Sequence, residues 1–278
     1  MLKREDIRIR DPFIWVDREE GVYYMYGTTS LLEGSIAAGN TFSAYVSHDL
    51  ENFEGPYVVV DGTELGLAYT KDFWAPEVHK YNGKYYLFGS MKADGKCRAT
   101  QIFVADTPLG KFRPVAETPA TPADWECLDG TLWVEGGTPY IVFCHEWLQV
   151  GDGQVCAMPL NKELTAPIGE PILLFRAGDR ADVEEIGAKV RGKVTDGPFL
   201  YEEEGKLKMI WSSFSEGKYA VLIAESEGGV AGPWKHKENR FGFDGGHAMI
   251  FTDLNGKRLI SLHKPNTTSL ERAVFLEI

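Results

Sequence analysis

Cysteine, positive charge and long apolar runs are all scarce in this sequence. The 278 residues include four cysteines, at positions 97, 127, 144 and 156, and no two of them form a Cys-x-x-Cys pair. We therefore expect reduced, mostly buried thiols and no zinc site. The chain has no run of about 18 apolar residues, and its first residues, MLKREDIRIRDPF, lack the apolar core of a signal peptide. These absences predict a cytoplasmic protein with no membrane partner.

The charge balance excludes another class of partner. The chain has 29 Lys and Arg against 41 Asp and Glu, giving a formal net charge of −12. No basic stripe is present, so we expect no nucleic-acid partner. Aromatic residues make up 12% of the chain, which is typical of β-structure. Flat rings suit sugar stacking as well as core packing, and a neutral glycan is compatible with the acidic surface.

An internal repeat organises the chain. Five similar segments begin at positions 10, 73, 128, 195 and 245. Each has a small or polar start, an apolar strand, a turn containing glycine, and a second apolar strand. The turn residues at 82–83, 136–137, 204–205 and 255–256 are those of tight hairpins. A third strand follows each hairpin, and in the first four repeats a fourth strand or edge follows.

A repeat of roughly 50–65 residues with about four antiparallel strands is typical of propeller blades. The sequence therefore predicts an all-β protein: a single five-bladed β-propeller domain over residues 1–278, with almost no helix. The last repeat lacks a fourth strand, and we expect residues 2–8 to close it. Residues 178–193 are charged and are predicted to form a long loop.

The geometry of a propeller brings polar residues together at one mouth. The first strand of each blade lies nearest the axis, and a hairpin returns its second strand to the same face. The starts of the first strands carry Asp11, Glu77, Asp129, Asp196 and His247. The ends of the second strands carry His145, Glu146 and His263. Some of these acids are expected only to bond backbone amides, but together they supply the two carboxyl groups that glycosidic bond hydrolysis needs.

Five short motifs, one per blade, resemble those of glycoside hydrolase family 43, the five-bladed arabinofuranosidases, arabinanases and xylosidases. They are Arg10-Asp11-Pro12-Phe13, Trp74-Ala75-Pro76-Glu77-Val78, Leu128-Asp129-Gly130, Asp196-Gly197-Pro198-Phe199-Leu200 and Gly246-His247. The resemblance covers nearly the whole chain. It implies hydrolysis of arabinofuranosidic or xylosidic bonds in plant-type saccharides, with inversion and with no required cofactor.

The resemblance also implies roles for the acids. Asp11 falls where the family has its general base. Asp129 falls where a third carboxylate orients the acid and raises its pKa. The family's general acid is usually Glu, whereas this chain has Asp196, which is one methylene shorter and shifts the proton donor by about 1 Å. Glu146, in His145-Glu146-Trp147, is therefore an alternative acid.

Substrate contacts and a metal are further implications. Trp74 and Trp147 are expected to stack on sugar or to pack the core, and Glu77, His145 and His263 are expected near the substrate. His247 resembles a family histidine near the axis. It is expected either to be a satisfied structural residue or to lie beside a Ca²⁺ ion held largely through water.

Two other functions are alternatives. Five-bladed fructosidases also have an Arg-Asp-Pro motif, but their Asn-Asp-Pro-Asn-type first-blade motif is missing here. A non-catalytic glycan-binding propeller is the other, because Asp196 departs from the usual acid.

Overall fold

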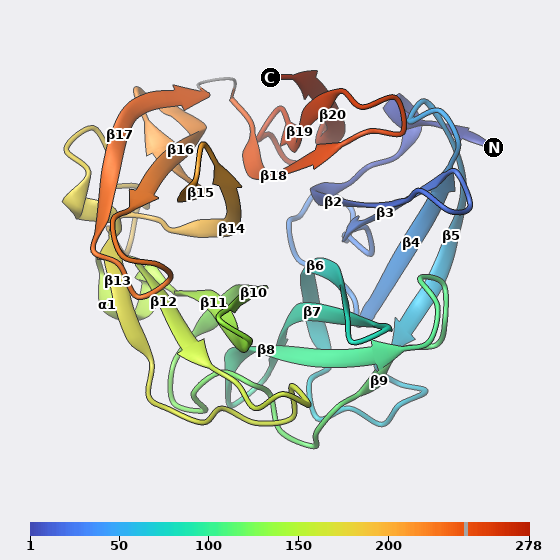
Figure 1. Cartoon of the computed structure of the whole chain (residues 1–278), viewed down its shortest axis with the longest axis horizontal. Coiled ribbons are helices and arrows are strands. Elements are labelled where there is room, and N and C mark those ends of the chain that lie inside the picture. The colour runs from blue at the N-terminus through green and yellow to red at the C-terminus, as the bar shows by residue number, and fades with distance from the viewer. Residues whose placement is uncertain (242–243) are drawn as a thin grey trace.

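The computed structural model describes residues 1–241 and 244–278, and it is a ring of five antiparallel sheets around a central axis (Figure 1). This confirms the predicted five-bladed β-propeller. The helices are single turns: η1 (Arg4–Asp6), α1 (Trp147–Val150) and η2 (Ala177–Asp179). No helix among the described residues is long and apolar enough to cross a membrane.

Each sheet is one blade, and its strands follow one another outward from the axis. Blade 1 contains β2 (Arg10–Asp17), β3 (Val22–Thr28), β4 (Thr41–Ser47), β5 (Asn52–Asp61) and β1 (Leu2–Lys3). Blade 2 contains β6 (Lys71–Tyr81), β7 (Lys84–Ala93), β8 (Lys96–Ala105) and β9 (Arg113–Pro114). Blade 3 contains β10 (Cys127–Glu135), β11 (Thr138–His145), β12 (Gln154–Pro159) and β13 (Ile172–Arg176). Blade 4 contains β14 (Asp196–Glu203), β15 (Lys206–Ser215), β16 (Lys218–Ser226) and β17 (Trp234–Phe241), and blade 5 contains β18 (Gly246–Thr252), β19 (Arg258–Lys264) and β20 (Arg272–Glu277).

Tight turns join the two inner strands of each blade, and their backbone explains the residues found there. Asn82 and Gly83 have φ of 48° and 79°, and Glu204 and Gly205 have φ of 53° and 74°. Two consecutive residues with positive φ twist a hairpin in the sense that its strands require. Asn and Gly tolerate that region, so the turn signals mark the hairpins correctly.

The expectation that residues 2–8 complete the last blade is wrong. β1 pairs with β5, with Leu2 opposite Phe53, so it extends the outer edge of blade 1. Blade 5 has three strands. The N-terminal segment reaches blade 5 through isolated hydrogen bonds instead: Arg4 Nη1 donates to the Ala273 carbonyl at 3.0 Å, and the Ile9 N–H donates to the Glu271 carbonyl at 3.3 Å. η1 turns the chain between these contacts, and this prevents one continuous strand from forming.

Apolar side chains fill the spaces between neighbouring blades. Phe42, Phe73 and Phe103 are fully buried in one such cluster, and Phe175 packs against Trp211 in another. The cysteines are free thiols; Cys127, Cys144 and Cys156 are buried and Cys97 is partly buried. Because protein interiors pack densely, the blades form a rigid support for the ends of the strands at the axis.

Candidate active site

Every innermost strand begins with the same irregularity. In each of the five blades the register between the first and second strands shifts near the start of the first strand, and in blade 2 the shift in question lies between Trp74 and Glu77. The second residue of each shift has positive φ: Asp11 (55°), Ala75 (46°), Asp129 (55°), Gly197 (51°) and His247 (49°). A bulge of this kind re-aims side chains. Strained backbone in non-glycine residues gathers at functional sites, and here it places Asp11, Asp129 and His247 around the axis.

Asp196 occupies a different backbone position from the other two aspartates. It precedes the positive-φ residue Gly197, so it corresponds to Arg10 in the first blade. A Cβ on Gly197 would lie 2.7 Å from Cδ2 of His247. Only glycine satisfies both the backbone angle and this close contact, and this explains the Asp-Gly pair.

Side chains of the preceding blade hold these bulges. Thr28 Oγ1 accepts from the Ala75 N–H, Ser90 Oγ from the Asp129 N–H, and Ser212 Oγ from the His247 N–H, each at 2.8 Å. His263 Nδ1 accepts from the Asp11 N–H at 3.2 Å. Each acceptor lies on a second strand, opposite the residue before its own blade's bulge.

The fifth such contact is different. Cys144 occupies the acceptor position in blade 3, opposite Leu128. Sulfur is a weak acceptor, and the Gly197 N–H donates instead to Asp129 Oδ2 at 3.0 Å. The Asp129 carboxylate is therefore bonded to the backbone beside Asp196.

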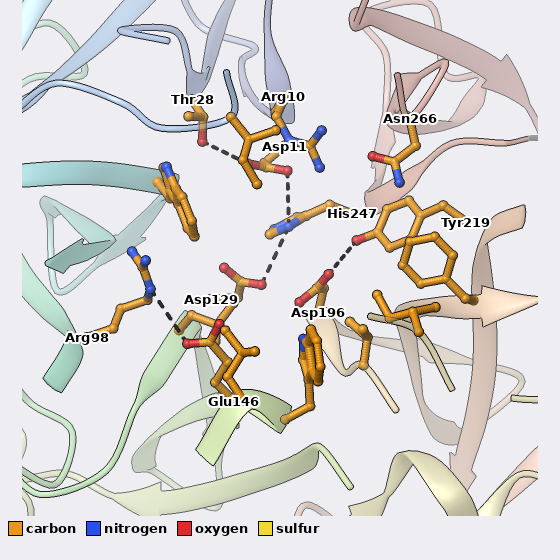
Figure 2. Close-up of a pocket in the computed structure, with 18 of the residues that line it drawn as sticks. Arg10, Asp11, Thr28, Arg98, Asp129, Glu146, Asp196, Tyr219, His247 and Asn266 are labelled. Carbon is orange, nitrogen blue, oxygen red and sulfur yellow. Dashed lines mark hydrogen bonds and ion pairs between the residues drawn. The ribbon is translucent and has the colours of Figure 1, made fainter. Parts of the chain in front are cut away.

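A cavity of about 440 Å³ opens where these residues meet. Its wall contains seven of the residues singled out from the sequence: Asp11, Trp74, Asp129, Glu146, Trp147, Asp196 and His247. Figure 2 shows Asp11 and Asp129 joined to His247, and Asp196 nearby and joined to Tyr219. The predicted mouth therefore exists, with acids from blades 1, 3 and 4 facing one space.

Three other singled-out residues do not line the cavity. Glu77 is buried and its Oε2 lies 3.2 Å from Nε2 of His79. His145 stacks on Trp125 with ring centroids 4.2 Å apart, and its Nε2 lies 2.7 Å from Oε1 of Gln149. Both contribute to the packing behind the wall.

His263, the third of these, is fully buried and supports Asp11 from behind. Burial lowers its pKa. Nδ1 accepts the Asp11 N–H, so the remaining proton of the neutral ring lies on Nε2, which is 3.3 Å from Oδ1 of Asn266. His263 therefore fixes the position of Asp11 without contacting the cavity.

Asp11 is held as a carboxylate. Its Oδ2 accepts a hydrogen bond from Thr28 Oγ1 at 2.7 Å, and its Oδ1 lies 3.3 Å from Nδ1 of His247. Burial raises the pKa, but the positive charges of His247 and Arg10 outweigh it and hold the pKa of Asp11 well below its ordinary value. Asp11 is therefore a carboxylate at neutral pH.

Asp196 has the opposite environment. Burial and the nearby Asp129 carboxylate raise its pKa to about 7, although His247 and a 2.9 Å hydrogen bond from the Tyr219 hydroxyl to Oδ2 favour the charged form. Burial also raises the pKa of Asp129, against the attraction of His247. Asp196 can therefore hold a proton near neutral pH while Asp11 does not.

His247 supplies the positive charge between the carboxylates. Its Nδ1 lies 3.3 Å from Asp11 Oδ1 and 3.6 Å from Asp129 Oδ2. Burial lowers its pKa, but Asp11, Asp129, Glu77 and Asp196 outweigh this and raise it. Direct binding of a metal to a ring nitrogen would therefore require His247 to lose a proton that its acidic neighbours favour. Among residues 1–241 and 244–278, no three His, Cys, Asp or Glu side chains are grouped to hold a metal, and Ca²⁺ at the axis stays a prediction.

Several residues of the wall were not assigned a role from the sequence. They include Arg10, Arg98, Tyr219 and Asn266. Arg10 belongs to the first motif, and its Nη1 lies 3.2 Å from Oε1 of Glu271. Arg98 and Tyr219 lie on third strands, where no sequence motif marks them.

Fold and cavity together define a propeller glycosidase, because a charged and a protonatable carboxyl group face one cavity from separate blades. A family model described as glycosyl hydrolases family 43 matches residues 6–278, and the chain belongs to that family. This confirms the resemblance seen in the motifs and sets aside the fructosidase alternative.

Individual relatives agree with this assignment. The chain is 38% identical to an endo-arabinase of Bacteroides thetaiotaomicron VPI-5482 whose crystal structure superposes with a TM-score of 0.91, covering 100% of this chain and 96% of that one. It is 25% identical to a probable arabinan endo-1,5-alpha-L-arabinosidase A of Aspergillus flavus, over 94% of this chain and 83% of the relative. A family 43 β-xylosidase/α-arabinofuranosidase from a compost metagenome shares the fold with a TM-score of 0.75 at 16% identity, covering 100% of this chain and 93% of that one.

Proposed function

We propose that this glycosidase hydrolyses α-1,5-L-arabinofuranosidic bonds of arabinan with inversion, using Asp11 as base and Asp196 as acid. The observation that carries the proposal is that the pKa values of the two carboxyl groups are shifted in opposite directions. The pKa of Asp11 is lowered, and that of Asp196 is raised to about 7. Carboxyl groups whose environments separate their pKa values in this way divide into a base and an acid.

The chemical step follows from these protonation states. Asp11 accepts a proton from a water molecule as the water oxygen bonds to the anomeric carbon. Asp196 donates its proton to the glycosidic oxygen as the bond from that oxygen to the anomeric carbon breaks. Tyr219 donates to Oδ2 of Asp196, so the transferable proton belongs on Oδ1. Attack opposite the leaving group inverts the anomeric configuration.

Asp129 acts on the acid rather than on the sugar. Its negative charge is the largest effect after burial on the raised pKa of Asp196. Its bond to the Gly197 N–H also fixes the backbone next to the acid. These two contacts suit a group that keeps Asp196 protonated and in place.

The choice of arabinan is supported by the relatives. The 38% identical structure, which covers the whole chain, is that of an endo-arabinase. The Aspergillus flavus relative described above is a probable arabinan endo-1,5-alpha-L-arabinosidase A. Solved structures whose names include a xylanase or xylosidase activity are only 16–23% identical to this chain.

One experiment tests both the choice of substrate and the stereochemistry of the reaction. Linear α-1,5-arabinan is incubated with the enzyme, and proton NMR follows the first anomer released. We expect rapid release of arabino-oligosaccharides with the β configuration at the new reducing end. Cleavage of xylan without cleavage of arabinan would overturn the substrate, and a retained anomer would overturn Asp11 as base.

The acid is tested by the leaving group. Asp196→Ala should abolish cleavage of arabinan but cost far less with dinitrophenyl α-L-arabinofuranoside, because that leaving group departs without a proton. Glu146→Ala should show no such difference. The reverse pattern would make Glu146 the acid.

A further inference from the structure

Arg98 is a buried cation in the cavity wall whose charge is poorly matched. It lies on β8, its side chain is 7% exposed, and its guanidinium carbon is 3.7 Å from the centroid of the Trp74 ring. Stacking on Trp74 holds the guanidinium plane in one orientation. Arg98 is therefore preorganised in the wall of the cavity that the three aspartates line, although the proposed chemistry gives it no step.

The partners of Arg98 are all distant. Nη1 donates to the Asp72 carbonyl at 3.4 Å, and Nη2 lies 3.7 Å from Asp72 Oδ2. Nε lies 3.9 Å from Oε2 of Glu146 and has no hydrogen-bond partner within the described residues. A buried charged donor without a bond of normal length is unfavourable, and this points to a ligand that completes it.

Glu146 faces the same gap. Its side chain is 14% exposed, lines the cavity and makes no hydrogen bond to the part of the chain that the structure describes. The backbone holds it in place, because the Glu146 N–H donates to the Glu126 carbonyl at 2.8 Å and Glu146 is the N-cap of α1. Figure 2 shows Arg98 and Glu146 pointing toward each other from blades 2 and 3.

The distance between Arg98 Nε and Glu146 Oε2 indicates which kind of ligand atom fits between them. Two atoms 3.9 Å apart can both be bonded by one oxygen about 2.8 Å from each, with an angle of about 90° at that oxygen. The oxygen must accept from Arg98 Nε–H and donate to Glu146 Oε2. A sugar hydroxyl group does both, in the place of a water molecule, whereas a carboxylate cannot donate and an ammonium cannot accept.

We propose that Arg98 and Glu146 together bind one hydroxyl group of the arabinofuranosyl unit that lies beside Trp74. This inference rests on the proposed function, because it takes the occupant of the cavity to be a pentose glycoside. It makes Glu146 a substrate-binding residue that selects sugars with a hydroxyl at this place, and it leaves proton donation to Asp196.

The test is a double-mutant cycle on linear α-1,5-arabinan. Arg98→Lys keeps the charge but removes the Nε–H fork, and Glu146→Gln keeps the shape but removes the charge. We expect each single variant to lower kcat/KM by about 10- to 100-fold, since a hydrogen bond to a charged group is lost or weakened. The double variant should fall no more than about 3-fold below the worse single variant, because both contacts go to one hydroxyl. Multiplying losses would overturn the shared hydroxyl.

Binding is measured separately from turnover. In an Asp11→Asn background, arabinotriose should bind about 10-fold or more weakly once Glu146→Gln is added, whereas Glu163→Gln, at an exposed site, should leave binding unchanged. Unchanged binding with Glu146→Gln would overturn the proposal, and this variant decides the case even if Arg98→Lys does not fold.

The leaving group separates binding from acid catalysis. Glu146→Gln should lower kcat/KM by the same factor for nitrophenyl and dinitrophenyl α-L-arabinofuranosides. Rescue by the better leaving group would make Glu146 an acid and refute the binding role. A wild-type enzyme that binds and cleaves no arabinan would instead refute the proposed function on which this inference rests.

Discussion

Replacing Asp196 with Asn should abolish activity and stabilise the protein. Asp196 has an ordinary pKa of 3.8 and a pKa of about 7 in the fold. The native state therefore binds this proton more tightly than the unfolded chain does. Wild-type stability is then fully present below a pH of about 4 and declines as the pH rises to about 7. A pKa difference of about three units corresponds to about 4 kcal/mol of unfolding free energy, which the wild type loses as the pH rises. The Asn variant does not lose it, because its side chain is neutral at every pH.

The assay is thermal unfolding of wild type and Asp196→Asn between pH 4 and pH 8. We expect equal stability near pH 4 and a higher Tm for the variant at pH 8, by about 8 °C for a chain of this size. Asn retains an oxygen that accepts from Tyr219, so packing is kept. Asp106→Asn, at a site that is 87% exposed, is the matched control and should shift the Tm little. A difference between wild type and Asp196→Asn that does not change with pH would refute the raised pKa.

The other predictions concern the same cluster. kcat/KM should fall above a pH of about 7, where Asp196 loses its proton; a pH–rate profile flat to pH 9 would contradict this. Asp11→Asn should lower kcat by several orders of magnitude and should also destabilise the protein at neutral pH, because the native state favours the Asp11 anion; calorimetry and turnover of arabinan check both. Cys144→Ser should provide a competing acceptor for the Gly197 N–H, which now bonds Asp129, and so move the basic limb of the pH–rate profile; an identical profile would show that Cys144 has no such effect.

The repeat predicts the fold because every blade needs the same tight turn between its two inner strands. Hairpin turns such as Asn82-Gly83 require positive φ, and few residues supply it, so they are visible in the sequence. The position of β1 was not predictable, since a strand of two residues has no periodicity. Its pairing with β5 depends on which edge lies within reach of the N-terminus in the folded ring.

Site residues could be predicted from the sequence where the acid itself is the positive-φ residue of a bulge. Asp11 and Asp129 lie at equivalent positive-φ positions, but the equivalent residue in blade 2 is Ala75, and Glu77 lies two residues later, inside the sheet. The presence of a carboxylate in the motif could not show that Glu77 lies two residues away from the position that points to the axis. Arg98 and Tyr219 reach the cavity from third strands, and their reach depends on side-chain directions that only the packed blades define.

The hydrogen bonds from blade to blade have a consequence for the order of folding. The Asp11 N–H is held by His263, which lies 252 residues later in the chain. Synthesis proceeds from the N-terminus. The hydrogen bond that holds the bulge at Asp11 therefore cannot form until the last blade has been made. A chain that stops before β19 lacks His263 and therefore lacks the acceptor for the Asp11 N–H. We therefore expect enzymatic activity to appear only once the ring has closed.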